Sequence, residues 1–233
     1  DQTSGFSIVS WTGTGANATV GHGLGATPKV VIVKNRSASG GWFVGNIDVG
    51  FNYEFRLDES GARSGSSTLF NETNPTSTVF TVGSAAGTNG STNNMIAYCF
   101  AEIDGFSKFS TYEGNGSSDG PFVYLGFKPR FLIVRRYDGA DGWAMLDTAR
   151  GSGNFGSAAG TGGENPKAGN EMNNKINAND AFAEEDNSGG SRKCSFLSNG
   201  FKVKNTNTAM NTSGGDYFYM AFAEAPFQTA TAR

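Results

Sequence analysis

The chain has 233 residues, of which 37% are hydrophobic, with a net charge of −3 and a sequence pI near 5.2. It is long enough to bury a substantial core, and its acidic balance gives no electrostatic reason to expect a nucleic-acid partner. No run of about 18 apolar residues is present, so no membrane span is predicted. Glycine is abundant (34 residues) and charged residues are few (17%), which is typical of short strands joined by tight turns.

The first half of the chain reads as a series of short strands. Alternating apolar residues predict a strand over 5–11, and a run of β-branched residues after Pro28 predicts a buried strand over 30–34. Shorter strands are expected at 41–44 and 80–82. Residues 95–102 carry apolar side chains on both faces of an eight-residue strand, which predicts a strand at the centre of a sheet.

The same order of motifs returns in the second half. Gly105-Phe106-Ser107 repeats Gly5-Phe6-Ser7 100 residues later, and Trp143 follows Trp42 by 101 residues. The strand at 217–224 repeats 95–102 with a longer offset of 122 residues, so the second copy holds an insertion. These spacings predict an internal duplication, with a first β repeat at 1–104 and a second at 105–233.

The strands and turns together predict an all-β fold. Two internal repeats are expected to form antiparallel β-sandwich units, jelly-roll-like, with long polar loops. The polar loops are predicted at 46–78, where apolar anchors are few, and at a Gly-rich insertion covering about 150–193. A segment of that length without structure is usually functional or disordered.

The sequence offers few candidates for catalysis. His22 is the only histidine, and its place at the end of a predicted strand favours packing or surface exposure over proton transfer. Glu102 and Glu224 provide a potential carboxylate pair for glycoside hydrolysis. Because they occupy equivalent positions of the two repeats, strand-end charges or pairing with Lys34 or Arg135 are the favoured interpretations. We therefore predict no catalytic residue and no enzyme activity.

Neither a metal site nor a disulfide is predicted. Asp138 and Asp141 stand in a turn with a faint likeness to a calcium loop, but the first copy has no carboxylate at the matching place, which favours a plain turn. Cys99 matches Ala221 of the second copy and is expected to be a small buried residue. Cys194 has no counterpart. Two free thiols, no metal and no cofactor are expected.

Aromatic residues are the remaining candidates for ligand binding, because a ring face can stack on a sugar ring. Trp42 and Trp143 repeat in the frame and are predicted to be core residues. Trp11, at the end of a predicted strand, is the better candidate for an exposed platform. Tyr112 and Tyr137 are further candidates for binding.

Several motifs are long enough to be specific. They include Gly-Phe-Ser-Ile-Val-Ser-Trp-Thr-Gly at 5–13, Gly-Leu-Gly-Ala-Thr-Pro-Lys at 23–29 and Ala-Tyr-Cys-Phe-Ala-Glu at 97–102, with Gly-Phe-Ser at 105–107 and the closing segments at 197–202 and 219–227. These motifs resemble a module of unknown function from phage structural proteins, often found at the end of tail-fibre-like chains beside laminin-G or concanavalin-like lectin domains. The resemblance covers nearly the full chain, but 150–193 is longer and more Gly-rich than the module.

The resemblance implies a non-enzymatic structural protein of a phage virion, made in the host cytoplasm and carried on the virion surface. A tail fibre or related appendage that acts in adhesion or assembly is the favoured role. The expected partners are other virion proteins, further copies of the chain and host surface glycan. A capsid-decorating or head-fibre protein and a carbohydrate-binding module are alternatives, and a glycan depolymerase that uses Glu102 or Glu224 is the least favoured.

We predict that the loops at 46–78 and 150–193 carry the binding or subunit contacts, because rigid strands commonly hold functional loops outward. Deleting 151–191 is then expected to leave the fold intact and to weaken assembly or attachment. Thermal unfolding and an attachment assay on the shortened protein would check this, and unfolding of the remainder would contradict it.

Overall fold

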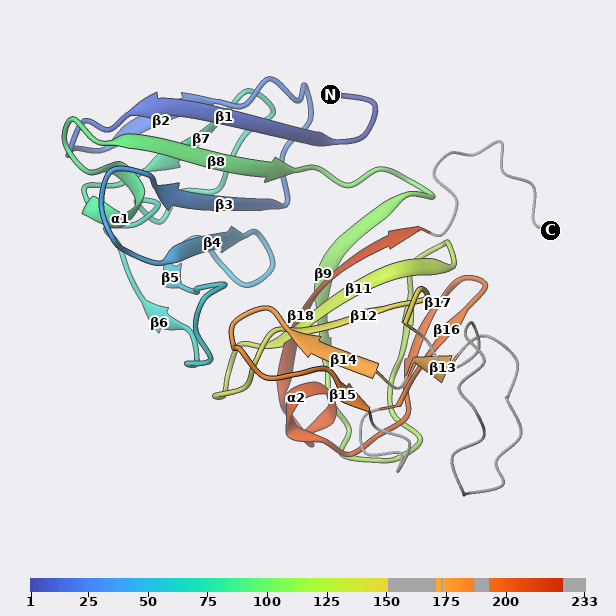
Figure 1. Cartoon of the computed structure of the whole chain (residues 1–233). Coiled ribbons are helices and arrows are strands. Elements are labelled where there is room, and N and C mark those ends of the chain that lie inside the picture. The colour runs from blue at the N-terminus through green and yellow to red at the C-terminus, as the bar shows by residue number, and fades with distance from the viewer. Residues whose placement is uncertain (151–170, 173, 187–192, 224–233) are drawn as a thin grey trace. The chain divides into compact units, whose positions relative to one another are not determined.

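The computed structural model describes residues 1–150, 171–172, 174–186 and 193–223 (Figure 1). The fold is all-β and antiparallel, as predicted. The helices found in these ranges, α1 (Ala86–Asn89) and α2 (Thr208–Asn211), have four residues each, and none is long and apolar enough to cross a membrane. The chain divides into two compact units, Asp1–Ile103 and Asp104–Arg233.

The first unit is built on one main sheet with a smaller ribbon. Its strands are β1 (Phe6–Thr12), β2 (Ala18–Gly21), β3 (Val30–Asn35), β4 (Trp42–Asn46), β5 (Tyr53–Glu54), β6 (Ser64–Gly65), β7 (Val79–Val82) and β8 (Asn94–Phe100). The main sheet has the order β1-β8-β3-β4, whereas β2 pairs with β7 and β5 pairs with β6. The strand predicted to be central, β8, lies between β1 and β3.

The core of the first unit lies between the main sheet and the β2–β7 ribbon. Met95, Ala97 and Cys99 on β8 have no exposed surface, and they belong to one cluster with Phe80 and Val82 of the ribbon. Alternation along β8 places the next residues on the opposite face, which is only half-buried. The two-sided apolar pattern of this strand therefore reflects one fully buried face and one partly covered face.

The second unit has two larger sheets. Its strands are β9 (Ser107–Glu113), β10 (Phe122–Tyr124), β11 (Pro129–Arg136), β12 (Ala144–Asp147), β13 (Glu171–Met172), β14 (Asn174–Asn177), β15 (Glu185–Asp186), β16 (Cys194–Leu197), β17 (Gly200–Val203) and β18 (Asp216–Ala223). One sheet has the order β15-β14-β12-β11-β18-β9 and the other β10-β17-β16-β13. A single apolar cluster draws on both sheets, which is the arrangement of a β-sandwich.

The two units share one strand order. Four strands of the first unit, β1-β8-β3-β4, correspond in chain position to β9-β18-β11-β12, and the second set has the same order in its sheet. The pair β2–β7 likewise corresponds to β10–β17, and each unit has a short helix before its last strand. Common descent of the two halves stays a prediction, and this shared order is the observation that favours it.

A buried asparagine ends the helix of each unit and holds the loop after the first strand. The Asn89 amide donates to Thr14 Oγ1 (2.9 Å) and to the Ala16 carbonyl (2.6 Å), and its Oδ1 accepts from the Thr14 N–H (3.0 Å). Asn211 donates to the Ser117 carbonyl (2.7 Å) and accepts from the Asn115 N–H (2.8 Å). Each side chain thus provides hydrogen-bond partners for backbone N–H and C=O groups of a turn that are not paired with a strand.

Glycine lets this loop approach the helix end. A Cβ on Gly13 would overlap the carbonyl oxygen of Gly90, and a Cβ on Gly114 would overlap that of Thr212. Any side chain at either glycine would push the loop away from its asparagine. The loop and the helix end therefore form one packed unit in each half of the chain.

The prediction that 46–78 is a polar loop with few apolar anchors is wrong. Five of its residues are at most 5% exposed and belong to the core: Val49, Phe51, Phe55, Leu69 and Phe70. Phe51 and Phe70 also form an edge-to-face pair with centroids 5.2 Å apart. Polar residues separate these side chains along the chain. The average composition of 46–78 is therefore polar although five of its apolar side chains are buried.

The segment predicted as a second loop is also part of the fold where it is described. Residues 151–170, 173 and 187–192 lie outside the described residues, but β14 pairs with β12 in the main sheet. Asn179 Oδ1 accepts from the Trp143 N–H (2.7 Å), and Lys175 is buried. Deleting 151–191 would remove β14 and Asn179, so the expectation that this deletion leaves the fold intact loses its structural basis.

Replacing Asn89 by alanine is expected to lower the free energy of unfolding by about 1–3 kcal/mol, because buried turn groups would lose their hydrogen-bond partners. Urea unfolding followed by circular dichroism measures the change. Asn17→Ala is the matched control, since Asn17 is exposed and its side chain bonds to the equally exposed Asn71. Equal midpoints for the two variants would show that the buried asparagine has no special role.

Candidate functional site

Trp11, the favoured binding residue, lies near the end of β1 with its ring directed toward the core. The ring meets Phe80 edge-to-face with centroids 5.7 Å apart. Its Nε1–H donates to Oδ1 of Asn89 at 3.3 Å. The side chain is half-buried, so it is fixed by the core and by the buried asparagine while part of its surface stays open.

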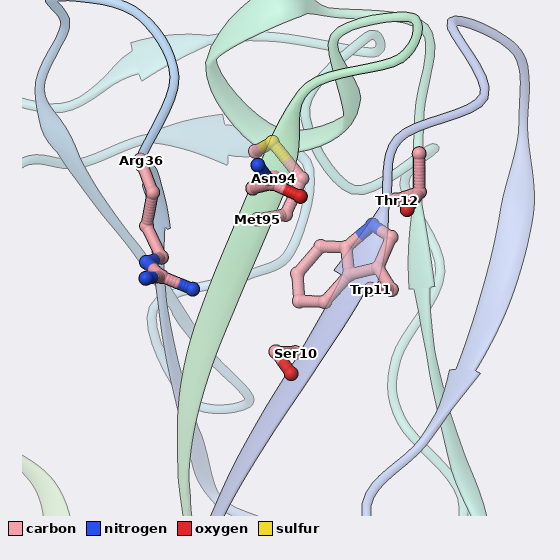
Figure 2. A pocket seen from close by; sticks show the side chains of 6 residues that line it. All are labelled: Ser10, Trp11, Thr12, Arg36, Asn94 and Met95. Atoms are coloured by element: carbon pink, nitrogen blue, oxygen red, sulfur yellow. The ribbon is translucent and has the colours of Figure 1, made fainter.

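A depression of about 220 Å³ lies around this tryptophan (Figure 2). Its lining comes from β1, β8 and the residue after β3, and consists of Ser10, Trp11, Thr12, Arg36, Asn94 and Met95. Thr12 and Asn94 are direct partners across β1 and β8. The Arg36 N–H donates to the Asn94 carbonyl (2.8 Å), which extends the β3–β8 pairing by one residue.

The depression is lined mainly by polar side chains. Ser10, Thr12, Arg36 and Asn94 are exposed, and they offer hydroxyl, guanidinium and amide groups. Arg36 has no ion-pair partner among the described residues. The six lining side chains include no histidine, carboxylate or thiol. The site can therefore bind a hydroxylated or anionic group, and it holds no residue suited to general acid or base catalysis.

Tyr112 occupies the position in β9 that Trp11 occupies in β1, but its ring is surrounded by other aromatic rings. It stacks on Tyr217 with centroids 5.0 Å apart and meets Phe201 edge-to-face at 5.9 Å. Its hydroxyl donates to the Met210 carbonyl (2.8 Å). Burial raises the pKa of this tyrosine well above its ordinary value. The geometry is that of a core residue with a satisfied polar end.

Tyr137 is only 7% exposed, so its ring presents almost no surface to a ligand. The three predicted binding residues are thus distributed over the two units, with Trp11 in the first and both tyrosines in the second. Ligand binding at these positions stays a prediction. Trp11 is the candidate whose surroundings are open.

The residues considered for catalysis have structural contacts. His22 is buried; its Nε2 lies 3.1 Å from the Thr76 carbonyl and its Nδ1 accepts from the Leu24 N–H (3.2 Å). It therefore packs at the end of β2, one of the two roles predicted for it. Glu102 follows β8 and is half-buried. Glu224 lies outside the described residues, so the proposed carboxylate pair has no measured geometry.

The turn with a likeness to a calcium loop is held by an arginine. Asp138 accepts from Arg136 Nε (2.8 Å) and from the Asp216 N–H (3.1 Å), and Asp141 lies 3.8 Å from the same guanidinium. The hydrogen bond from Arg136 lowers the pKa of Asp138. These contacts tie the turn to β18. In the described ranges, no group of three or more side chains is arranged to hold a metal ion.

The tryptophans predicted as core differ between the units. Trp143 is 1% exposed, which confirms its prediction, with the Arg135 guanidinium 5.9 Å from its ring. Trp42 is half-buried on the open face of the first sheet, with Lys34 Nζ 5.6 Å from its ring. A cation beside a tryptophan thus recurs at matching positions of the two sheets. Burial lowers the pKa of Arg135 to about 10.

Sequence reasoning missed two exposed aromatic residues of the second unit. Phe122 and Tyr124 lie on β10 and are 45% and 60% exposed. Strand pairing places Thr19 and Gly21 of β2 at the matching positions in the first unit. A comparison of the two predicted repeats at outward-facing positions, instead of at the core positions that match, would have found them.

Residues 1–226 match the model of a protein family described as "Domain of unknown function (DUF7483)". The chain belongs to this family. The DUF7483 match includes the described part of both units, so they are parts of one family module. No curated protein and no solved structure matches the chain.

The two cysteines are free, as predicted, and both are buried, although burial was predicted only for Cys99. Burial raises the pKa of Cys99 to about 12 and also raises that of Cys194. A thiol with a raised pKa stays protonated at about pH 8, where a thiol of ordinary pKa is partly ionised and reactive.

We expect neither cysteine to react readily with Ellman's reagent in the native protein at about pH 8, because the thiolate is the reactive form. Both thiols are expected to react once the protein is unfolded in guanidinium, which serves as the control. Absorbance of the released thiolate gives the rate. Rapid reaction of a native thiol would contradict the burial described for Cys99 or Cys194.

Proposed function

We propose that this chain is a non-enzymatic structural protein of a phage virion. It would lie on the virion surface in a tail fibre or related appendage and act in adhesion or assembly. The phage assignment is supported by the resemblance of the motifs described above. The mode of action is supported by the site: an open, polar depression built on a paired sheet suits contact with another surface.

The observation that carries the proposal is the placement of the depression on regular backbone. β1 and β8 pair from Phe6↔Phe100 to Thr12↔Asn94 without a break in register. Side chains held on such strands lose little further backbone freedom on binding. Hydroxyl, amide and guanidinium groups at fixed positions suit a hydroxylated or anionic partner, such as host glycan or the polar rim of a neighbouring subunit.

The position on the virion tests the assembly half of the proposal. Gold-labelled antibody against the chain, viewed on intact particles by electron microscopy, is expected to mark the tail or its fibres. Label on the capsid would favour a decorating or head-fibre protein, and absence of label from purified particles would contradict a virion role.

Replacing Arg36 by alanine is expected to weaken attachment of the purified protein to bacteria that the phage infects by about fivefold or more, because a charged hydrogen bond to the partner is lost. Flow cytometry of cells with fluorescently labelled protein measures attachment. Arg130→Ala is the charge-matched control, since Arg130 is also exposed but lies in the second unit. Equal attachment of both variants would exclude the depression as the contact site, and no attachment of the unaltered protein would contradict a role in adhesion.

A further inference from the structure

We propose that the exposed face of β10 is a second binding site, in which Phe122 and Tyr124 stack on the sugar rings of an anionic polysaccharide. The inference rests on the proposed adhesive function, and it assigns to the second unit a site and a ligand class of its own. β10 is an edge strand of the sheet β10-β17-β16-β13.

The two aromatic residues form one platform. They are two positions apart on β10, so their side chains leave the same face of the strand about 7 Å apart. Val123 between them points inward and is 9% exposed, whereas Phe122 and Tyr124 are 45% and 60% exposed. An aromatic face binds the C–H surface of a pyranose ring, and two rings in a row can contact neighbouring sugars of one chain.

Each ring lies beside a glycine, and Tyr124 also lies beside a lysine. A Cβ on Gly200 would lie 3.0 Å from Cζ of Phe122, so this ring lies over a residue that has no side chain. A Cβ on Gly126 would lie 3.7 Å from the Tyr124 hydroxyl oxygen. Lys108 Nζ donates to the Tyr124 carbonyl (3.2 Å) and lies 5.5 Å from the centre of its ring. A ring already held in place loses little entropy when it binds.

Lysines surround the platform in a chain whose net charge is −3. Lys202 is the direct partner of Phe122 on β17, and its Nζ lies 2.7 Å from a carboxylate oxygen of Asp119. The hydrogen bond and charge of Lys202, together with the charge of Lys204, lower the pKa of Asp119. Lys108 lies beside Tyr124, so three lysines and the one carboxylate of Asp119 are placed near the rings by the contacts of the described residues. This balance favours a ligand that carries carboxylate or other anionic groups.

The internal comparison shows that the fold does not require these aromatics. In the first unit the matching residues on β2 are Thr19 and Gly21, while the inward residue is valine in both strands. The rings therefore add surface, not core packing. Two half-exposed aromatic side chains of about 150–250 Å² each also fall short of the roughly 800 Å² per partner of a standard protein interface. Their size matches one or two sugar rings.

Affinity electrophoresis of the full chain tests the site. Native gels contain alginate or hyaluronate as acidic polysaccharides, or dextran as a neutral one. The unaltered protein is expected to be retarded by an acidic polysaccharide and not by dextran. Phe122→Ala and Tyr124→Ala are each expected to weaken that binding by about three- to tenfold, since each removes one stacking ring. Phe182→Ala is the matched control, because Phe182 is an aromatic residue of the same unit that is 76% exposed.

Lys202→Ala is expected to weaken retardation by the acidic polysaccharide. The proposal is overturned if no acidic polysaccharide retards the unaltered protein, if dextran does so equally, or if the ring variants behave like Phe182→Ala. It is also overturned if light scattering shows that the ring variants dissociate an oligomer, which would make the platform a subunit contact. Urea midpoints equal to that of the unaltered protein show that the variants are folded.

The cell-attachment assay separates this inference from the proposed function. If the unaltered protein attaches to host bacteria and the double variant Phe122→Ala/Tyr124→Ala attaches equally, the proposal of a binding site on β10 is wrong. The proposed adhesive function is then still supported. If attachment falls for the double variant but not for Phe182→Ala, both are supported. If the unaltered protein does not attach at all, the adhesive function itself fails, and the inference fails with it.

Discussion

One inner strand of each main sheet, β8 in the first unit and β18 in the second, is the element on which the rest of the structure depends. β8 pairs with β1 on one side and β3 on the other, and β18 pairs in the same way with β9 and β11. Each central strand thus joins segments that are far apart in sequence, so its register determines where the other strands lie. Small side chains on the core face, such as Ala97 and Ala221, have no exposed surface and leave room for larger residues of the opposing strands. The residues of β8 and β18 therefore stabilise the fold both by backbone pairing and by close side-chain packing.

The buried asparagines connect this frame with the surface. Asn89 hydrogen-bonds to the backbone of the turn that crosses the end of its helix. Its Oδ1 also accepts a hydrogen bond from the indole N–H of Trp11. One side chain thus holds a loop and orients the ring beside the polar depression. Asn211 holds the matching loop, where Tyr112 instead donates to the Met210 carbonyl. A polar residue in the core therefore determines the geometry of an exposed site, which an apolar residue of the same size could not do.

The regular strands were predictable because their signal is periodic. Alternation in 5–11 and the apolar run in 30–34 correspond to β1 and β3, and the two-sided pattern at 95–102 correctly indicated a central strand. The core contribution of 46–78 was not predictable in this way, since Phe51, Phe55 and Phe70 are fixed by irregular backbone that has no sequence period. The asparagine contacts were missed for a related reason: many of their partners are backbone groups of turns that lie far away in the sequence, and such groups carry no residue signature.

The candidate sites lie where the two units differ in sequence, and the motif comparison used positions at which the units agree. Matching positions, such as Val20 and Val123, report the demands of the core, because both copies must fill the same space. They carry no information on what the surface does. Outward-facing positions that differ between the units do not have to fill the core. Phe122 and Tyr124 are two such positions. Two units with the same strand order can therefore present unlike surfaces in one chain. The outward-facing positions at which the units differ are the better guide to where each surface acts.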